Sequence, residues 1–212
     1  MSKSVELLFL SQEDVIAAGG LDIKAVIDAE VKAYSMLDKG EAQDPVAPQI
    51  HLEDQHAKRI MAIHPSWLAG DANVAGMKLG ARAPDNPRKL GLPSITSLIE
   101  LINPMTGHPF AVMDGAFITA MRTGATTGVA LRYFGREDME TAALLGAGVM
   151  GRAQAMAIAS ELKNLKDVRL YDIYRDKAEA WAEEMKEITG LPIRVVDSSE
   201  EAIRDADLVA PT

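Results

Sequence analysis

Six residues that follow a short apolar run constrain the fold of this chain more than any other feature. Gly146-Ala147-Gly148-Val149-Met150-Gly151 matches the pattern G-x-G-x-x-G, which opens a dinucleotide-binding unit when a strand precedes it and a helix follows it. Thr141–Leu145 is the expected strand, and the helix is expected to run to about Leu162. The glycines permit a tight turn and a close approach to a pyrophosphate, and the helix N-terminus offers free N–H groups.

An acidic residue stands at the distance that this pattern requires. Asp172 follows the next expected strand, 21 residues after Gly151. A carboxylate at that place accepts hydrogen bonds from the adenosine ribose and repels a 2′-phosphate. The sequence therefore favours NAD as the cofactor, and Arg175 nearby leaves NADP as the alternative. The competing interpretation is a glycine-rich turn with a surface aspartate.

Strands and helices alternate through the rest of this region. The expected strands are Val168–Tyr171, Ile193–Val196 and Asp207–Ala210, with helices at Asp176–Ile188 and after Ser198, which has capping-box spacing to Glu201. Such alternation predicts a parallel, doubly wound α/β sheet. A complete dinucleotide fold has about six strands, so we expect residues 137–212 to form an incomplete Rossmann-type domain and the chain to be a fragment.

The first 136 residues read as a separate α/β domain. Ser11 and Asp14 have capping-box spacing, and the amphipathic stretch after Asp22 ends at Gly40. A proline-punctuated loop is expected next, around Pro45 and Pro48. The other expected elements are strands at Arg59–His64 and Asn73–Leu79 with a turn near Pro65 and Gly70, a loop at Ala81–Pro93, a hairpin formed by Ile95–Ile102 and Phe110–Met113, and a helix at Phe117–Phe134.

Composition narrows the classes of function. The net charge of −9 argues against a nucleic-acid surface, and the chain has no cysteine for disulfides or thiolate chemistry. No apolar run reaches the roughly 18 residues of a membrane span, and the first ten residues do not resemble a signal peptide. We expect a cytoplasmic protein that binds small molecules. The four histidines show no metal-ligand spacing: His51, His56, His64 and His108.

Two cations stand in apolar or small-residue surroundings. Lys78 lies between Met77 and Leu79 in an expected strand, and Arg122 lies near the start of an expected helix. A charge in such a place is costly unless it is paired or exposed. Guanidinium binds a carboxylate through two parallel hydrogen bonds, and lysine adds a point charge. The two residues are candidates for binding an amino acid's carboxylate; the alternative is a strand-edge lysine and a helix-surface arginine.

Several motifs, in the same order along nearly the whole chain, resemble the ornithine cyclodeaminase/mu-crystallin family. The most specific stretch runs from Met113-Asp114-Gly115 to Arg122-Thr123-Gly124-Ala125. The others are Gly107–Val112, Ala75-Gly76-Met77-Lys78, Gly91-Leu92-Pro93-Ser94 and Leu145–Val149.

The resemblance implies a substrate-binding, dimer-forming α/β domain over residues 1–136, followed by the Rossmann domain. The chain of family members then returns to the first domain with a segment that this sequence lacks. Cyclodeaminases of the family use NAD to convert ornithine into proline and ammonia through an imine, and this is the activity we expect of the full-length parent, as a homodimer. Alanine dehydrogenase, ketimine reductase and a non-catalytic mu-crystallin-like binding protein are the alternatives. The sequence does not identify which amino or imino acid is the substrate.

The resemblance also assigns roles to individual residues. Lys78 and Arg122 match ligands of the substrate carboxylate. The residues implied at the cofactor are Ser94, Arg122, Thr123, Gly146, Gly148, Val149, Met150, Gly151, Asp172 and Thr212.

Three departures from the family pattern bear on activity. Gln49 stands where the family usually has arginine or lysine as a further carboxylate contact, which predicts weaker carboxylate binding or a different substrate. Met150 stands where the family often has glutamine. The family's catalytic aspartate lies beyond Thr212, so we expect this chain alone to be inactive.

Overall fold

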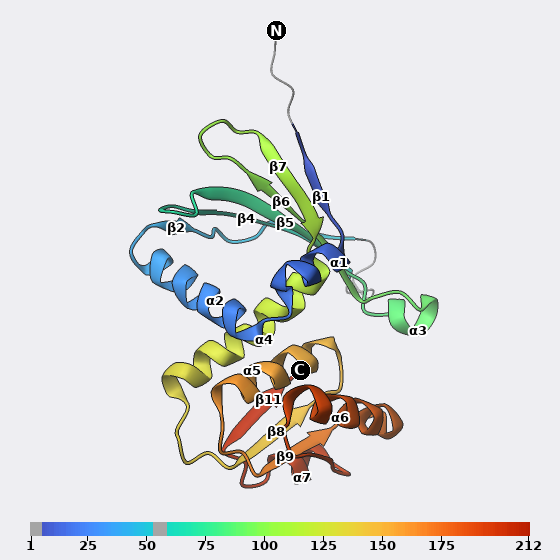
Figure 1. The fold of residues 1–212 in the computed structure, drawn as a ribbon. Coiled ribbons are helices and arrows are strands. Elements are labelled where there is room, and N and C mark those ends of the chain that lie inside the picture. Colours follow the sequence, from blue (N-terminus) through green and yellow to red (C-terminus); the bar gives the residue numbers. More distant parts are fainter. Residues whose placement is uncertain (1–5, 53–58) are drawn as a thin grey trace. The chain divides into compact units, whose positions relative to one another are not determined.

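The computed structural model describes residues 6–52 and 59–212 of the chain (Figure 1). By its internal contacts the chain divides into two compact units, Met1–Gly20 with Lys32–Thr119, and Leu21–Val31 with Ala120–Thr212. Helix α2 (Ile23–Asp38) contributes to both units. Among the described residues no helix is long and apolar enough to cross a membrane. The assignment of separate functions to residues 1–136 and 137–212 stays a prediction.

The first unit is built on one sheet, which has seven strands within the described residues. Its order is β1-β7-β6-β5-β4-β2, with β3 also paired to β4; all pairs are antiparallel except β1 with β7. The strands are β1 (Leu8–Leu10), β2 (Ala42–Gln43), β3 (Gln49–His51), β4 (Ile60–Leu68), β5 (Val74–Arg82), β6 (Ile95–Ile102) and β7 (Pro109–Asp114). The helices are α1 (Gln12–Val15), the π-helix η1 (Ile16–Gly20) and α3 (Asn86–Leu90).

The turn expected near Pro65 and Gly70 is confirmed at Gly70 but wrong at Pro65, which lies inside β4 and pairs with Met77 of β5. On its other edge, β4 is covered by β3 only as far as Ala62 and by β2 only from Trp67. Pro65 falls in the gap between these two short strands, where a missing backbone N–H leaves no ladder bond unmade. The real turn spans residues 69–73.

The loop expected around Pro45 and Pro48 is confirmed, at residues 44–48 between the short strands β2 and β3, which were not expected. One further expectation for this unit needs correction. The expected loop at Ala81–Pro93 contains the helix α3, which ends at Gly91 in the left-handed conformation. The capping box at Ser11 is confirmed, since both of its reciprocal hydrogen bonds with Asp14 are present.

The second unit has a four-stranded, all-parallel sheet in the order β10-β9-β8-β11, which confirms the expected doubly wound class. Every strand and helix expected in residues 141–212 is present. They are β8 (Thr141–Leu145), α5 (Val149–Glu161), β9 (Asp167–Tyr171), α6 (Arg175–Thr189), β10 (Ile193–Val195), α7 (Ser199–Ile203) and β11 (Leu208–Pro211).

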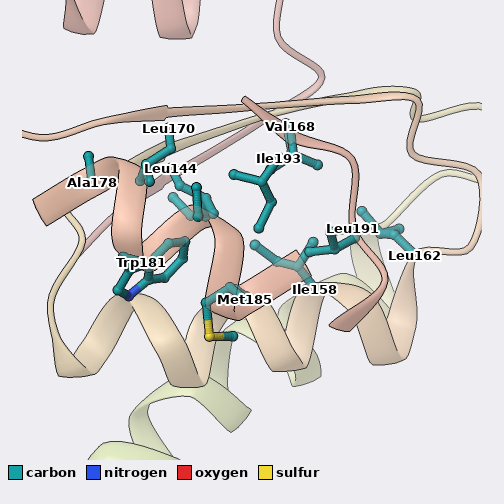
Figure 2. Close-up of a cluster of buried hydrophobic side chains, with 14 of the residues drawn as sticks. Leu144, Ile158, Leu162, Val168, Leu170, Ala178, Trp181, Met185, Leu191 and Ile193 are labelled. Carbon is teal, nitrogen blue, oxygen red and sulfur yellow. The ribbon is translucent and has the colours of Figure 1, made fainter. Parts of the chain in front are cut away.

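The core of the second unit lies between this sheet and two of its helices. Figure 2 shows side chains of β8, β9 and β10 meeting those of α5 and α6. Leu144 and Leu170 on the strands are fully buried, as are Ile158 on α5 and Met185 on α6. Trp181 is buried as well and packs in this core. This core holds β8 and α5, and therefore the loop between them, in place.

Helix α4 (Ala116–Phe134) packs tightly in the second unit because it carries glycines on its contact face. A Cβ on Gly124 would lie 2.4 Å from the backbone of Ala153 on α5, and a Cβ on Gly128 would meet the side chain of Ile27 on α2. Ile27 and Ala125 are both fully buried in this contact. The absence of a Cβ at Gly124 and Gly128 thus lets α4 lie close to α5 and α2.

Candidate functional site

The glycine loop between β8 and α5 is tightly built at its first and third glycines. Gly146 has φ 121°, a conformation that residues with a Cβ rarely adopt, and a Cβ there would lie 2.2 Å from Thr212 Oγ1. A Cβ on Gly151 would lie 2.7 Å from the carbonyl oxygen of Gly146. These are the tight turn and the close helix–strand packing that the fingerprint requires of its first and third glycines.

The second glycine faces open space instead. Gly148 is the N-cap residue of α5, and a Cβ there would have no atom within 4 Å. No side chain caps this helix end, and Val149 beside it is 67% exposed. The first N–H groups of α5 are therefore available to an anion that approaches over Gly148, which fits the pyrophosphate of a dinucleotide.

Asp172 lies at the end of β9, directly beside this loop. Its Oδ2 accepts a hydrogen bond from the N–H of Ala147 and its Oδ1 one from the N–H of Tyr174, both at 2.8 Å. A carboxylate has about four lone-pair sites, so two remain for ribose hydroxyls. The guanidinium of Arg175 is engaged with Glu179 at 2.8 Å and with Asp197. The half-buried Asp172 is thus held at the loop, while Arg175 is tied to other carboxylates.

Thr212 also reaches the loop. Its Oγ1 lies 3.0 Å from the carbonyl oxygens of both Leu145 and Gly146, and its N–H donates to Leu145 at 2.9 Å. The exposed Thr212 side chain therefore sits at the turn where the cofactor is expected. The structure brings together Gly146, Gly148, Val149, Gly151, Asp172 and Thr212, with the half-buried Met150 between them.

Lys78 occupies a different surface, one face of the first-unit sheet. In the register of β4, β5 and β6 it stands directly opposite His64 on one side and Ile99 on the other. Opposite residues in such a ladder have Cβ atoms about 5 Å apart and point to the same face. Lys78 and His64, both half-buried, are therefore neighbours on this face.

Gln49 belongs to the adjoining row of the same face. It pairs with Ala62 of β4, and Ala62 pairs with Gly80 of β5. Ala62 lies two residues before His64 on β4, and Gly80 lies two residues after Lys78 on β5. The Gln49 side chain is exposed. Ser94 lies just before β6, where its carbonyl oxygen accepts a hydrogen bond from Ala83 at 2.8 Å. Gln49 and Lys78 thus share one face of the sheet.

Arg122 lies on α4 within the second unit, as does Thr123. Among the described residues the exposed Arg122 guanidinium forms no ion pair within hydrogen-bond reach. One turn further along, Thr126 Oγ1 donates to the Glu30 carboxylate at 3.1 Å. Partial burial raises the pKa of Glu30 above its usual value, and the Thr126 hydrogen bond and the charge of Arg122 oppose that shift. Arg122 therefore faces an acidic neighbour on α2.

Two of these neighbours escaped prediction from the sequence. Glu30 comes from a helix about 90 residues before Arg122, and only the packing of α2 on α4 places them together. His64 was noted as a lone histidine; the hairpin register that sets it opposite Lys78 would have revealed it. Within residues 6–52 and 59–212 no cluster of potential metal ligands is present; His56, included in that expectation, lies outside the described residues.

The second unit combines a parallel sheet with a glycine fingerprint and an acidic residue at the end of the next strand, features that are typical of dinucleotide-binding folds as a class. The whole chain matches more specifically: residues 6–212 fit the model of the ornithine cyclodeaminase/mu-crystallin family. The chain belongs to that family, as its motifs indicated.

Two solved structures and one curated relative show the extent of the similarity. Thermococcus litoralis Δ1-pyrroline-2-carboxylate reductase, solved with NADH and L-proline, is 36% identical with a TM-score of 0.88, and the match covers 96% of this chain and 61% of that one. An archaeal alanine dehydrogenase dimer with bound NAD is 31% identical with a TM-score of 0.84, covering 98% and 60%. The alanine dehydrogenase of Archaeoglobus fulgidus is 34% identical over 82% of this chain and 50% of that protein.

These proteins carry reductase and dehydrogenase names. They favour the alternatives stated above over ornithine cyclodeaminase itself. The chain spans about 60% of the length of the two solved relatives.

Proposed function

We propose that this chain is part of an NAD-dependent enzyme that reduces the imine of a small amino acid, or oxidises the amino acid in the reverse direction. The observation that carries the proposal is the open N-terminus of α5 above Gly148, with Asp172 held beside it. An anionic group fits this helix end, because its first N–H groups have no side-chain cap and a Cβ on Gly148 would meet no atom within 4 Å. The names of the similar solved structures support the same class.

Different residues of the second unit bind different parts of the cofactor. The N–H groups at Val149 and Met150 bind the pyrophosphate, and Asp172 accepts hydrogen bonds from the adenosine ribose. Thr212, at the turn, and Thr123, on α4, contact the nicotinamide half. When bound, NADH supplies the hydride, and NAD accepts it in the reverse direction. The family resemblance makes Ser94 a further candidate contact of the cofactor.

The family resemblance makes Lys78 and Arg122 the candidate ligands of the substrate's carboxylate. A cation neutralises the charge of that group, and a guanidinium also orients it through two parallel hydrogen bonds. Gln49 shares the face of Lys78 and donates a neutral hydrogen bond to the same group. In the reduction, the imine carbon takes up a hydride and the imine nitrogen takes up one proton, which gives the amine. The proton comes from a group other than Lys78, Arg122 and Gln49.

A direct assay tests this function. The chain is mixed with NADH and Δ1-pyrroline-2-carboxylate, or with pyruvate and ammonia, and the loss of NADH absorbance is followed. Loss of absorbance with either substrate supports the proposal. A cyclodeaminase would instead form L-proline from L-ornithine without net change in NADH. NADH binding is measured separately by fluorescence, because failure to bind NADH would contradict the proposal whatever the assay gives.

We further propose that the protein pairs as a homodimer through the sheet face opposite Lys78. Phe9, Met77, Leu79 and Leu98 lie on that face and are exposed. An exposed apolar sheet face of this kind is typical of a buried interface, and a second copy offers the same surface by two-fold symmetry. The similar archaeal alanine dehydrogenase is a dimer.

A further inference from the structure

The first cation after the proposed ribose-binding acid is Arg175, which stands three residues after Asp172 and begins α6. Between them the chain turns around the carboxylate, because the N–H of Tyr174 donates to Asp172 Oδ1 at 2.8 Å. In dinucleotide-binding folds, an arginine near the ribose-binding acid is the residue that accommodates the 2′-phosphate of NADP. Arg175 is placed in the chain as such an arginine would be, although the proposed function uses NAD.

Two carboxylates hold the guanidinium of Arg175. Its Nε donates to Glu179 Oε1 at 2.8 Å, one turn further along α6, and its Nη1 donates to Asp197 Oδ1. Asp197 follows β10, the strand that pairs with β9, at whose end Asp172 lies. The hydrogen bond with Glu179 and the charge of Asp197 raise the pKa of Arg175 above its usual value. Three N–H donors of the guanidinium remain, but the two ion pairs decide where they point.

The next cation of α6 is engaged as well. Lys177 Nζ lies 4.9 Å from the centroid of the Tyr174 ring, a distance at which an ammonium group and an aromatic face attract each other. Within residues 6–52 and 59–212, neither Arg175 nor Lys177 forms an ion pair with Asp172. A 2′-phosphate at Asp172 would therefore meet a carboxylate, while both cations of the first helical turn are engaged elsewhere.

We propose that Glu179 and Asp197 are specificity-determining residues for the cofactor, because they withhold Arg175 from the 2′-phosphate of NADP. The inference rests on the proposed function, which takes Asp172 as the ribose-binding acid. Discrimination against NADP then has two parts: the charge of Asp172 repels the phosphate, and the ion pairs of Arg175 remove the cation that would compensate for that charge.

The exposure of these side chains sets the size of the second part. The side chains of Arg175, Glu179 and Asp197 are 53%, 54% and 82% exposed. Ion pairs between side chains that are so exposed are weak, because water screens both charges. The ion pairs of Arg175 should therefore bias cofactor choice by several-fold and should not form an absolute barrier to NADP.

Release of Arg175 tests the proposal. The double variant Glu179→Gln/Asp197→Asn keeps the size of both side chains and removes the charges that hold the guanidinium. Dissociation constants of NADH and NADPH are measured by fluorescence titration of the chain. NADPH should bind about fivefold more tightly, which is within the range that two exposed ion pairs allow, and NADH should change by less than about twofold.

Two further variants separate the release of Arg175 from a general loss of negative charge. Arg175→Met, added to the double variant, removes the freed guanidinium, so NADPH affinity should return to within about twofold of the unmodified chain. Glu183→Gln/Glu187→Gln makes the same change in net charge at exposed positions further along α6. Because these positions lie about 12 Å or more beyond the start of the helix, salt screens their charges and both cofactor affinities should stay within about twofold.

The possible failures are distinguishable. If the unmodified chain does not bind NADH, the proposed function fails and this inference fails with it. If NADH binds but Glu179→Gln/Asp197→Asn leaves NADPH affinity unchanged, only this inference fails. A gain that persists after Arg175→Met, or that Glu183→Gln/Glu187→Gln reproduces, would also overturn it, because the two carboxylates would then not act through Arg175. Unchanged NADH affinity and unchanged urea unfolding establish that each variant is folded.

Discussion

The carboxylate of Asp172 accepts a hydrogen bond from the backbone N–H of Ala147 at 2.8 Å, which ties the end of β9 to the glycine loop. Asp172 therefore holds the loop, and we propose that its charge also repels a 2′-phosphate. Asp172→Asn keeps the size of the side chain but removes its charge. We expect NADH to bind about tenfold more weakly, since hydrogen bonds to charged groups are worth about 1.5–3 kcal/mol.

The same variant should bind NADPH better than the unmodified chain does, because the repulsion is gone. The measurement is the ratio of the NADH and NADPH dissociation constants by fluorescence. Asp176→Asn, in the exposed first turn of α6, is the control. An unchanged ratio in Asp172→Asn would show that cofactor choice is made elsewhere.

The first and second glycines of the loop should respond in opposite ways to alanine. Gly146→Ala combines a positive φ with a contact at 2.2 Å to Thr212, and should destabilise the second unit by about 2 kcal/mol or more. Gly148→Ala meets no atom and has an ordinary φ, so stability should change by less than about 0.5 kcal/mol. Its added methyl group projects where the pyrophosphate is expected.

Gly148→Ala should therefore remain folded and lose NADH binding. Urea unfolding and NADH titration of the two variants are the paired measurements. Normal NADH affinity in Gly148→Ala would contradict the assignment of the open space at this helix end to the pyrophosphate.

The second unit was predictable because its signals are local. The glycine fingerprint is six contiguous residues, and Ser198 caps α7 by accepting from the N–H of Glu201, as the spacing indicated. Each buried strand is a short apolar run between helices, so no long-range information is needed to place it. The position of Asp172 followed from the length of one helix and one strand.

The first unit was less predictable because its edges depend on partners far along the chain. Gln49 forms a strand only because β4 offers it an edge, and Pro65 stays in a strand only because β2 and β3 leave a gap. Likewise, Lys78 was singled out by residue type, but its neighbours His64 and Ile99 follow from the register of three strands. Register is set by pairing across the sheet, which a linear pattern does not contain.

A charge cluster joins three helices of the second unit. Arg132 on α4 binds Glu161 on α5 through two hydrogen bonds of 2.8 and 3.0 Å, and Asp28 on α2 through one of 2.6 Å. The Arg132 hydrogen bonds hold the pKa of Glu161 below its usual 4.5. Since the unfolded chain binds this proton more readily, the ion pair stabilises the fold above pH 4.5 and its contribution is lost as pH falls through the lower folded-state pKa.

Arg132→Met should destabilise the second unit by about 2 kcal/mol near neutral pH, because it leaves the largely buried Glu161 carboxylate without its partner. Below the folded-state pKa of Glu161 the two proteins should converge. Urea unfolding at a series of pH values measures the difference. Arg136→Met, whose side chain is more exposed, is the control and should have a small effect. A difference that does not shrink in acid would exclude the ion pair as its cause.

Gly124→Ala should destabilise the second unit, although alanine has the higher helix propensity. In an exposed helix, glycine to alanine stabilises by about 1 kcal/mol. Here the new Cβ would lie 2.4 Å from the backbone of Ala153, so we expect a net loss of about 2 kcal/mol. Gly128→Ala meets mainly the flexible end of Ile27 and should cost less. In a Trp67→Phe background, Trp181 fluorescence reports unfolding of the second unit alone, and stabilisation by Gly124→Ala would contradict the close helix contact.

The last prediction concerns the proposed dimer interface, the sheet face opposite Lys78. Leu79 lies on β5 opposite Leu98, and both are exposed on the face turned away from Lys78. Leu79→Glu would bury a charge from each copy against the apolar groups of the proposed interface, so the dimer dissociation constant should rise by about 100-fold or more. Light scattering after gel filtration over a concentration series measures this dissociation constant.

Leu90→Glu is the matched control, because Leu90 is equally apolar and exposed but lies on α3, outside the sheet. An unmodified chain that stays monomeric at all concentrations, or a Leu79→Glu variant that stays dimeric, would exclude this face as the interface.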